Sequence, residues 1–550
     1  MRLTHSTIIT SFLFLLTSQN INAQNEVIEK YHNRQRPKLV VELVVGGLRY
    51  DQLYRFRNNF SDYGFKRLII QGASFTNARS SHMYTSPECG NATLASGANP
   101  SEHGIIGDQW VNYTTNEKIN ALQSKAYKGL GCNEDEGQFS PESLTASTLA
   151  DEIRSIDKKS KIYSIAIDHN DAIIHGGYKP TGCYWLDVRY GGFATSSYYT
   201  PILSQWVTDF NAAKVKWDYT NALWAVERSI DRYVYKNATS ILLDSTTKFT
   251  FDMLFKPKNR EFKRLLETPM GNSYLKDFAI EVVKRDSLGG DESTDLLVVN
   301  FASQRNISRI YGTSSTETED AYYKLDKDIA QLVEYLDNNI GSQNFVIVLT
   351  SSHGMSDNVT KKEASNEGKF NAMQFKVLIS GFLNAQLGAD NWVVSYRNRQ
   401  IYLNRRLIYE KNLSLQDIQN RVATFALQFA GVANAVTATT LQTNYFGKGI
   451  LSKMQNSFFP RHSGDLMINL LPGWIELDDE NDVTTSSLWG SSYEYDSHIP
   501  LIFYGKGINP QIIHSPVDLV DVAPTICEMV GVTNPNASSG KAINEIISSK

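Results

Sequence analysis

The chain has 550 residues, of which 41% are hydrophobic, 20% are charged and 15 are proline. This composition excludes a disordered, collagen-like or disulfide-framework protein, and the length allows one large domain or two to three of ordinary size. The 54 basic and 58 acidic residues give a net charge of −4. The chain therefore lacks the basic field that gathers nucleic acid, and we expect no nucleic-acid partner.

The N-terminus has the pattern of a secretory signal peptide. Arg2 and His5 precede an apolar run over residues 8–16, and Ala23 is the small residue that signal peptidases prefer. No other segment has the roughly 18 uninterrupted apolar residues of a membrane span, so no transmembrane span is predicted. We expect residues 1–23 to be cleaved and residues 24–550 to be exported to the periplasm or cell envelope, or secreted.

Short Val- and Ile-rich runs predict buried strands, with helical patterns between them. Strands are expected at residues 38–45, 162–167, 296–301, 345–350, 375–380 and 501–504. The clearest helix is expected over residues 319–339, where apolar residues share one face. Strands that alternate with helices predict an α/β fold with a mainly parallel sheet covered on both faces. Ligands in such folds bind after the carboxyl ends of the strands.

Two segments break the alternation. Residues 190–290 are rich in Tyr and Trp, and residues 385–460 predict a hairpin at 392–404 followed by a helix from about 414 to 430. We interpret both as cap insertions in one domain that spans residues 24–550. The cysteines match no metal-ligand spacing and leave any disulfide pairing open; they are Cys89, Cys132, Cys183 and Cys527.

Several motifs follow one another in an order that is familiar from one enzyme family. They are Leu48-Arg49-Tyr50-Asp51, Pro100-Ser101-Glu102-His103-Gly104, Gly107-Asp108-Gln109-Trp110, Leu349-Thr350-Ser351-Ser352-His353-Gly354, Arg461-His462-Ser463-Gly464-Asp465 and Tyr495-Asp496-Ser497-His498. Together they resemble the periplasmic alkaline phosphatases of the PafA type. Those enzymes belong to the alkaline phosphatase superfamily, which also holds the type I phosphodiesterases and nucleotide pyrophosphatases. The resemblance implies a three-layer αβα sandwich with cap insertions.

The resemblance also implies a reaction that uses two zinc ions and a Thr or Ser nucleophile. One ion lowers the pKa of the nucleophile, and the other stabilises the departing oxygen. Carboxylate and imidazole are the ligands that such zinc ions take. Transfer of the family's pattern, residue by residue, therefore tests whether this chemistry is retained.

Most positions that correspond to metal ligands carry other residues. Gly46 and Ser352 stand where the family has Asp, and Arg305 and Arg309 stand where it has Asp and His. A guanidinium group has no lone pair to donate to a metal and repels it. Two ligand positions keep their residue type, namely His353 and His498. We therefore expect no metal cofactor, or at most one weak site on these histidines with Asp496 or Asp168.

The positions that correspond to the nucleophile and to the phosphate contacts have changed as well. Pro87 stands at the nucleophile position and has no hydroxyl. Asp108 replaces an Asn, and Asp168 and Asn170 replace the Lys and Arg that mark the monoesterases. No catalytic residue of the inherited type is therefore predicted.

The residues leave two alternatives open for the pocket. Arg305 and Arg309 either pair with Asp108, Asp168 or Asp496 and fill the old cavity, or stand in an open cleft and bind a planar anion. Glu88, next to Pro87, is either a solvated loop residue or a new acid or base.

Two functions follow from these readings. The first is a catalytically degenerate binding or scaffold protein of the cell envelope, with a protein or another envelope component as partner. The alternative is a metal-dependent hydrolase of phosphate mono- or diesters, rebuilt around Ser86, Ser352 and the two histidines.

Overall fold

The computed structural model describes residues 36–236, 241–243, 249–251, 262–357, 368–478 and 485–547. The signal peptide expected at residues 1–23 lies outside this part of the chain. Within the described residues, no helix combines the length and apolar character needed to cross a membrane. The four cysteines carry free thiols.

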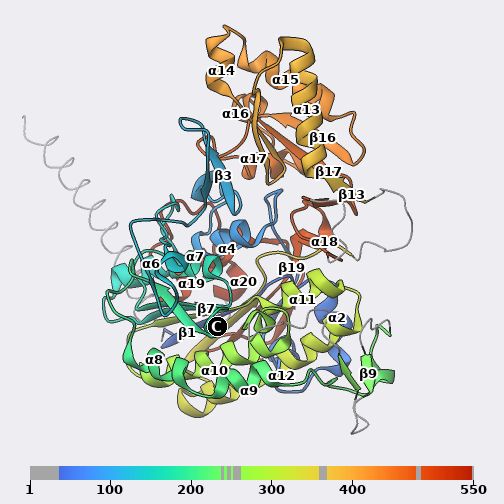
Figure 1. The fold of residues 1–550 in the computed structure, drawn as a ribbon. Coiled ribbons are helices and arrows are strands. Elements are labelled where there is room, and N and C mark those ends of the chain that lie inside the picture. Colours follow the sequence, from blue (N-terminus) through green and yellow to red (C-terminus); the bar gives the residue numbers. More distant parts are fainter. Residues whose placement is uncertain are drawn as a thin grey trace, which may run out of the picture.

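A large twisted sheet forms the centre of the main body (Figure 1). Its strands, in spatial order, are β20 (Gln511–Ile513), β2 (Ala73–Arg79), β19 (His498–Gly505), β12 (Phe345–Thr350), β1 (Leu39–Val45), β11 (Asp295–Phe301), β6 (Ile162–Ala166), β7 (Gly182–Asp187), β8 (Gly192–Ser196) and β5 (Gly129–Leu130), and β21 (Val517–Asp518) pairs with β2. The central strands β12, β1, β11, β6 and β7 are parallel, whereas β19 runs antiparallel to β12 and β2. Every residue of β1 is buried, as expected for a strand that is covered on both faces.

Helices cover both faces of this sheet and complete a three-layer αβα sandwich. Side chains of β1 alternate between two apolar cores, with Leu39, Val41 and Leu43 in one and Val40 and Val44 in the other. The first core includes α2 (Tyr50–Arg55), α3 (Phe65–Gln71), α10 (Pro269–Arg285), α11 (Ser303–Tyr311) and α12 (Thr316–Asn339). The second includes α4 (Pro87–Ser96), α6 (Leu149–Ile156), α19 (Val522–Val530) and α20 (Asn544–Ile547). The fold class predicted from the sequence is therefore confirmed.

A smaller unit, which we call the cap, stands above the carboxyl ends of the central strands (Figure 1). Its antiparallel sheet has the order β14 (Val393–Arg397), β15 (Gln400–Leu403), β17 (Leu466–Leu470) and β16 (Val432–Thr437). Its other elements are β13 (Lys369–Asn371), β18 (Ile475–Leu477), α13 (Ala372–Leu387), α14 (Arg405–Glu410), α15 (Leu415–Ala426), α16 (Ala438–Thr443) and α17 (Gly449–Asn456). The cap has an apolar core of its own.

The remaining elements lie between or beside these two units. They are α5 (Pro100–His103), the hairpin of β3 (Gln109–Asn112) and β4 (Glu117–Asn120), α7 (His169–Gly176), α8 (Gln205–Ala212), α9 (Val215–Asn221), the pair β9 (Ile241–Leu243) and β10 (Phe249–Phe251), and α18 (Glu494–Ser497). Part of the predicted insertion at 190–290 lies outside the described residues. The boundaries proposed for the two insertions stay predictions.

Most of the elements expected from the pattern are confirmed, including the helix that ends at residue 339 and the hairpin within residues 392–404. The strand expected at residues 375–380 is wrong, because these residues belong to α13. Phe375, Ile379 and Leu383 recur every fourth residue on the buried face, while Met373 and Val377 are exposed. A short apolar run is compatible with a strand or a helix, and only the longer periodicity separates them.

Candidate functional site

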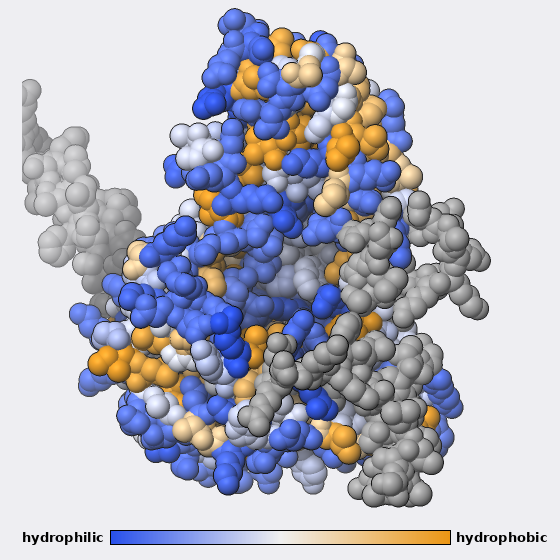
Figure 2. Space-filling model, viewed as in Figure 1, coloured by the Kyte–Doolittle hydropathy of each residue, from blue (hydrophilic) through white to orange (hydrophobic). Residues whose placement is uncertain are grey.

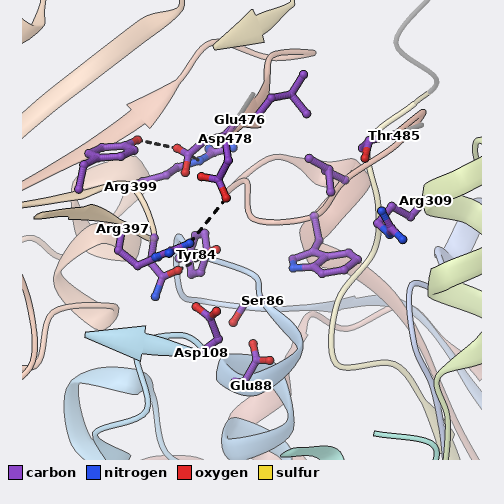
Figure 3. A pocket seen from close by; sticks show the side chains of 15 residues that line it. Tyr84, Ser86, Glu88, Asp108, Arg309, Arg397, Arg399, Glu476, Asp478 and Thr485 are labelled. Carbon is purple, nitrogen blue, oxygen red and sulfur yellow. Dashed lines mark hydrogen bonds and ion pairs between the residues drawn. The ribbon is translucent and has the colours of Figure 1, made fainter. Parts of the chain in front are cut away.

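A cleft with a volume of about 520 Å³ lies between the main body and the cap. Figure 2 shows the hollowed and mainly hydrophilic surface between these two parts. The cleft is lined by Tyr84, Ser86, Glu88, Asp108, Arg309, Tyr396, Arg397, Asn398, Arg399, Glu476, Leu477, Asp478, Thr485, Leu488 and Trp489. In Figure 3, Ser86, Glu88 and Asp108 lie on one side, and Arg397, Arg399, Glu476 and Asp478 lie opposite them. We call the first side the floor and the second the cap wall.

Arg305 is buried just below this cleft, on the first turn of α11. Its side chain is 6% exposed, and Nη1 lies 2.7 Å from Asp171 Oδ2 while Nη2 lies 3.1 Å from Asp168 Oδ2. Burial lowers the pKa of this guanidinium, and the two carboxylates raise it, so that the net pKa is raised above its ordinary value. For Arg305 the first of the two alternatives is therefore observed, with Asp168 as one partner and Asp171 as a second.

Gly46 makes room for this arginine. It follows the last residue of β1, and a Cβ atom at this position would lie 3.2 Å from Arg305 Cδ and 3.4 Å from its Cβ and Cγ. A side chain at position 46 would therefore press on the stem of Arg305, which would have to shift by a few tenths of an ångström. Gly46 and Arg305, two of the positions that the resemblance assigns to metal ligands, are therefore packed against each other.

A buried polar chain continues from Arg305 into the sheet. Asn91 donates from Nδ2 to Asp171 Oδ1 at 2.7 Å, and its Oδ1 lies 3.2 Å from His175 Nε2. His175 Nδ1 in turn lies 3.5 Å from Glu42 Oε2 on β1. Buried polar groups are tolerated when they are hydrogen-bonded in this way. Arg305 is thus part of a network that extends beyond the cleft.

Pro87 begins α4 at the bottom of the cleft, and the hydroxyl of Ser86 caps this helix by accepting a hydrogen bond from the Cys89 amide at 3.3 Å. Proline at the first helical position and serine at the cap are both favourable choices. Glu88 accepts a hydrogen bond from Asn170 Nδ2 at 3.3 Å. Burial, and then the nearby Asp108, raise the pKa of Glu88. The capping role gives Ser86 a structural reason to be at this position.

The two retained histidines point to different backbone groups. His353 is fully buried, with Nδ1 2.6 Å from the Gly354 carbonyl oxygen, and burial lowers its pKa to about 3. His498 places Nε2 2.9 Å from the Thr76 carbonyl oxygen and stacks on the Tyr50 ring at 4.5 Å. Among the described residues, no group of three or more His, Cys, Asp or Glu side chains is arranged to hold a metal ion.

The other predicted site residues are divided between the cleft and the interior. Arg309 and Asp108 line the cleft, and Asp108 is exposed. Ser352 is buried, and its hydroxyl has no hydrogen-bond partner in the part of the chain that the structure describes. Asp496 accepts a hydrogen bond from the Ser491 amide at 2.7 Å, and burial raises its pKa to about 7. Asp168 and Asp171 therefore meet at Arg305, whereas Asp496 is held by a backbone amide of its own loop.

The cap wall is formed by a tight hairpin between β14 and β15. Arg397 pairs with Gln400, and the two residues between them, Asn398 and Arg399, have φ angles of 52° and 58°. Such left-handed angles suit a two-residue hairpin turn but are uncommon for arginine. Asn398 anchors the turn to the main body by donating from Nδ2 to the Gln109 carbonyl oxygen at 2.8 Å. The turn thereby brings two arginines to the cleft.

Sequence reasoning missed Asp171 and the arginines of this hairpin. Asp171 lies three residues after Asp168 at the start of α7, so the helical spacing places both on one side of the helix. That spacing was a usable signal. Nothing in the local sequence of Arg397 and Arg399 indicates that a cap hairpin reaches the ends of the central strands.

Comparisons with known proteins agree with this architecture. Residues 40–494 match the family described as type I phosphodiesterase / nucleotide pyrophosphatase. The chain belongs to this family. It is 30% identical over 521 residues to alkaline phosphatase PafA of Elizabethkingia meningoseptica, which covers 93% of this chain and 95% of the relative. It is 31% identical over 521 residues to alkaline phosphatase PhoV of Synechococcus elongatus, with 93% of each chain covered.

The fold is similar to a solved structure of the same kind. The crystal structure of wild-type alkaline phosphatase PafA superposes with a TM-score of 0.84 at 29% identity, covering 93% of this chain and 99% of that one. The family assignment made from the motifs is therefore confirmed. The chemistry of this family member depends on its own side chains.

Proposed function

We propose that this family member has lost two-zinc phosphate ester hydrolysis and acts as an exported binding protein of the cell envelope. Its binding site is the cleft between the main body and the cap. The partner is a component of the envelope or a protein within it. By descent the chain is related to the phosphoric ester hydrolases.

The observation that carries this proposal is the position of Arg305. Its guanidinium group is bonded to Asp168 and Asp171, and its stem lies against Gly46. By the family's pattern, positions 46 and 305 would both supply carboxylates to metal ions. A cation bonded to two carboxylates at this place supplies positive charge without a metal, and it does not suit a pair of zinc ions as neighbours.

The floor of the cleft supports the same conclusion. Pro87 offers no hydroxyl, and Ser86, beside it, already caps α4. Asp108 stands where the family's pattern has an Asn that contacts phosphate, and it lines the cleft together with Glu88. An acceptor-only carboxylate repels a phosphate oxygen. Neither the nucleophile nor the phosphate contacts of the inherited reaction are therefore available.

One observation favours the alternative of a rebuilt metal-dependent hydrolase. His353 Nε2 and Ser352 Oγ are buried and have no hydrogen-bond partner among the described residues. Buried polar atoms of this kind need an explanation, and a bound cation is one. Two donors without a carboxylate make a weak zinc site, however.

The metal content of the purified mature protein tests the proposal. A binding protein of this kind is expected to contain substantially less than one zinc ion per chain by mass spectrometry, and to hydrolyse neither phosphate monoesters nor diesters above the protein-free background. Pro87→Thr is expected to remain inactive, since the metal ligands would still be missing. Alkaline phosphatase PafA, purified in the same way, is the positive control.

Stoichiometric zinc together with turnover that disappears in His353→Ala would refute the proposal and support the rebuilt hydrolase. Loss of the same turnover in His498→Ala would refute the proposal as well.

A further inference from the structure

The cap wall of the cleft contains arginine N–H groups without acceptors. Arg399 is 2% exposed, and its Nη1 is buried and has no hydrogen-bond partner among the described residues. The Nε atom of Arg397 is buried and unpartnered in the same sense. A buried donor that lacks an acceptor costs about 1–3 kcal/mol, and more when it is charged. Both residues line the cleft, so a ligand there can supply the missing acceptors.

The acidic residues of the cap wall do not accept hydrogen bonds from these N–H groups. Arg399 Nε lies 3.8 Å from Glu476 Oε2, and Arg397 Nη1 lies 3.8 Å from Asp478 Oδ2. Both separations are longer than a hydrogen bond. Glu476 instead accepts a hydrogen bond from the Tyr396 hydroxyl at 2.5 Å. The two carboxylates offset the charge of the arginines but leave N–H groups free to bind an anionic acceptor.

The turn that carries Arg399 is held in an unusual conformation. Its φ of 58° lies in the left-handed region, where a bulky residue is rare. Gly107 allows the turn to approach the main body, because a Cβ atom there would lie 2.1 Å from Asn398 Nδ2. Strained backbone that neighbours hold in place is concentrated at binding and active sites. The position of Arg399 is therefore built into the fold.

The floor and the aromatic side chains offer the opposite kind of contact. Glu88, Asp108 and Ser86 present oxygen atoms that accept hydrogen bonds from hydroxyl groups (Figure 3). Trp489 and Tyr84 also line the cleft and provide flat apolar surfaces. The lining thus combines arginine donors and two carboxylates on the cap wall, carboxyl and hydroxyl acceptors on the floor, and two aromatic rings.

We propose that this cleft binds a saccharide that carries a carboxylate, of the uronate class. The carboxylate of the sugar accepts hydrogen bonds from the free N–H groups of Arg397 and Arg399. The hydroxyl groups of the sugar donate hydrogen bonds to the carboxyl groups of the floor. A ring of the sugar lies against an aromatic side chain. This inference rests on the proposed function, because it assigns a ligand class to the same cleft.

Two other ligand classes fit this lining less well. A phosphate or nucleotide concentrates about two negative charges in one group, whereas each uronate ring carries one, so the carboxylates of the floor repel the phosphate group more strongly. A neutral saccharide would offer Arg397 and Arg399 neither a charged acceptor nor the two-oxygen contact that a carboxylate makes with a guanidinium group. The volume of about 520 Å³ is in the range of small-ligand sites.

Isothermal titration calorimetry of the mature protein tests the inference with three probes. They are trigalacturonate, a neutral galactotriose and AMP. We expect saturable binding of trigalacturonate and at least tenfold weaker binding of the other two. Equal affinity for galactotriose, preferential binding of AMP, or no saturable binding of trigalacturonate would overturn it.

Three variants connect the binding to the cleft. Arg399→Gln and Arg397→Gln are each expected to weaken trigalacturonate binding about tenfold or more, since each removes a charge-assisted hydrogen bond. Arg406→Gln is the matched control, because Arg406 is 76% exposed and pairs with Glu410 outside the cleft. Arg399 lies in a strained turn, and its substitution could prevent folding. Arg397 is 31% exposed, so Arg397→Gln still tests the inference if Arg399→Gln does not fold. Unchanged affinity in folded Arg397→Gln would overturn the inference.

The same protein preparation separates this inference from the proposed function. Zinc-free, inactive protein that does not bind trigalacturonate overturns the ligand class alone. Protein with stoichiometric zinc and phosphatase activity overturns the proposed function, whatever it binds.

Discussion

Replacing Arg305 with methionine tests how strongly this arginine stabilises its buried network of carboxylates. Methionine keeps much of the volume of the stem and removes the guanidinium group. Asp171, which is fully buried, would lose the partner at 2.7 Å and keep the hydrogen bond from Asn91. Asp168 is 35% exposed, so water can replace part of what it loses.

The expected cost follows from the burial of this pair. Removing one partner of a buried ion pair destabilises a protein by about 3–5 kcal/mol when the other charge remains buried without compensation. Burial raises the pKa of Asp171 to about 7, so this carboxyl group can take up a proton at pH 7 and we expect a cost near the lower end of that range. Most of this cost is assigned to Asp171. The double variant Arg305→Met/Asp171→Asn removes the uncompensated carboxylate, so it should recover about 2 kcal/mol or more relative to Arg305→Met.

Urea denaturation at pH 7 measures the four free energies of unfolding in this double-mutant cycle. The matched control is the cycle for Arg406 and Glu410, an exposed pair at 3.4 Å on α14. Its coupling energy should be about 0.3–0.5 kcal/mol, as for other exposed helix pairs. A coupling energy between Arg305 and Asp171 no larger than that of the control would refute the reasoning.

The remaining predictions concern the metal, the packing and the pH dependence. A chelator should leave the melting temperature of the mature protein unchanged, because a ligand stabilises only the state that binds it. Gly46→Asp should destabilise the protein by about 1–3 kcal/mol through the contact with Arg305. Asp496→Asn should flatten the pH dependence of stability. Burial raises the pKa of Asp496 to about 7, so the folded state keeps a proton that the unfolded chain releases at a lower pH. The stabilisation that comes from the protonated Asp496 carboxyl group is complete at pH values below the pKa of this group in the unfolded chain. It is lost as the pH rises through about 7.

Differential scanning calorimetry checks these three predictions. A fall of several degrees in the melting temperature on chelation would contradict the prediction that the protein is stable without metal. Gly381→Ala is the control for Gly46→Asp, since a Cβ atom at Gly381 meets nothing within 4 Å. For Asp496, the melting temperature of the unchanged protein should fall more between pH 5 and pH 8 than that of the variant. Parallel curves for the two proteins would contradict the assignment.

Sequence alone was sufficient for the fold class and for the family. The parallel sheet follows from short buried runs such as residues 345–350, and the family follows from the order of its motifs. Proline has no hydroxyl and arginine has no lone pair in any structure. The proposal that Pro87, Arg305 and Arg309 cannot serve the family's reaction therefore rests on the sequence.

Tertiary structure alone decided which groups those residues meet. Arg305 on α11 reaches Asp171 on α7 because β11 and β6 are neighbours in the sheet, although the two residues are 134 positions apart. Gly46 meets the same arginine because β1 is the other neighbour of β11. The cap hairpin brings Arg399 to the cleft through long-range contacts as well. Partners of this kind depend on how distant elements pack, and local sequence patterns carry no information on such packing.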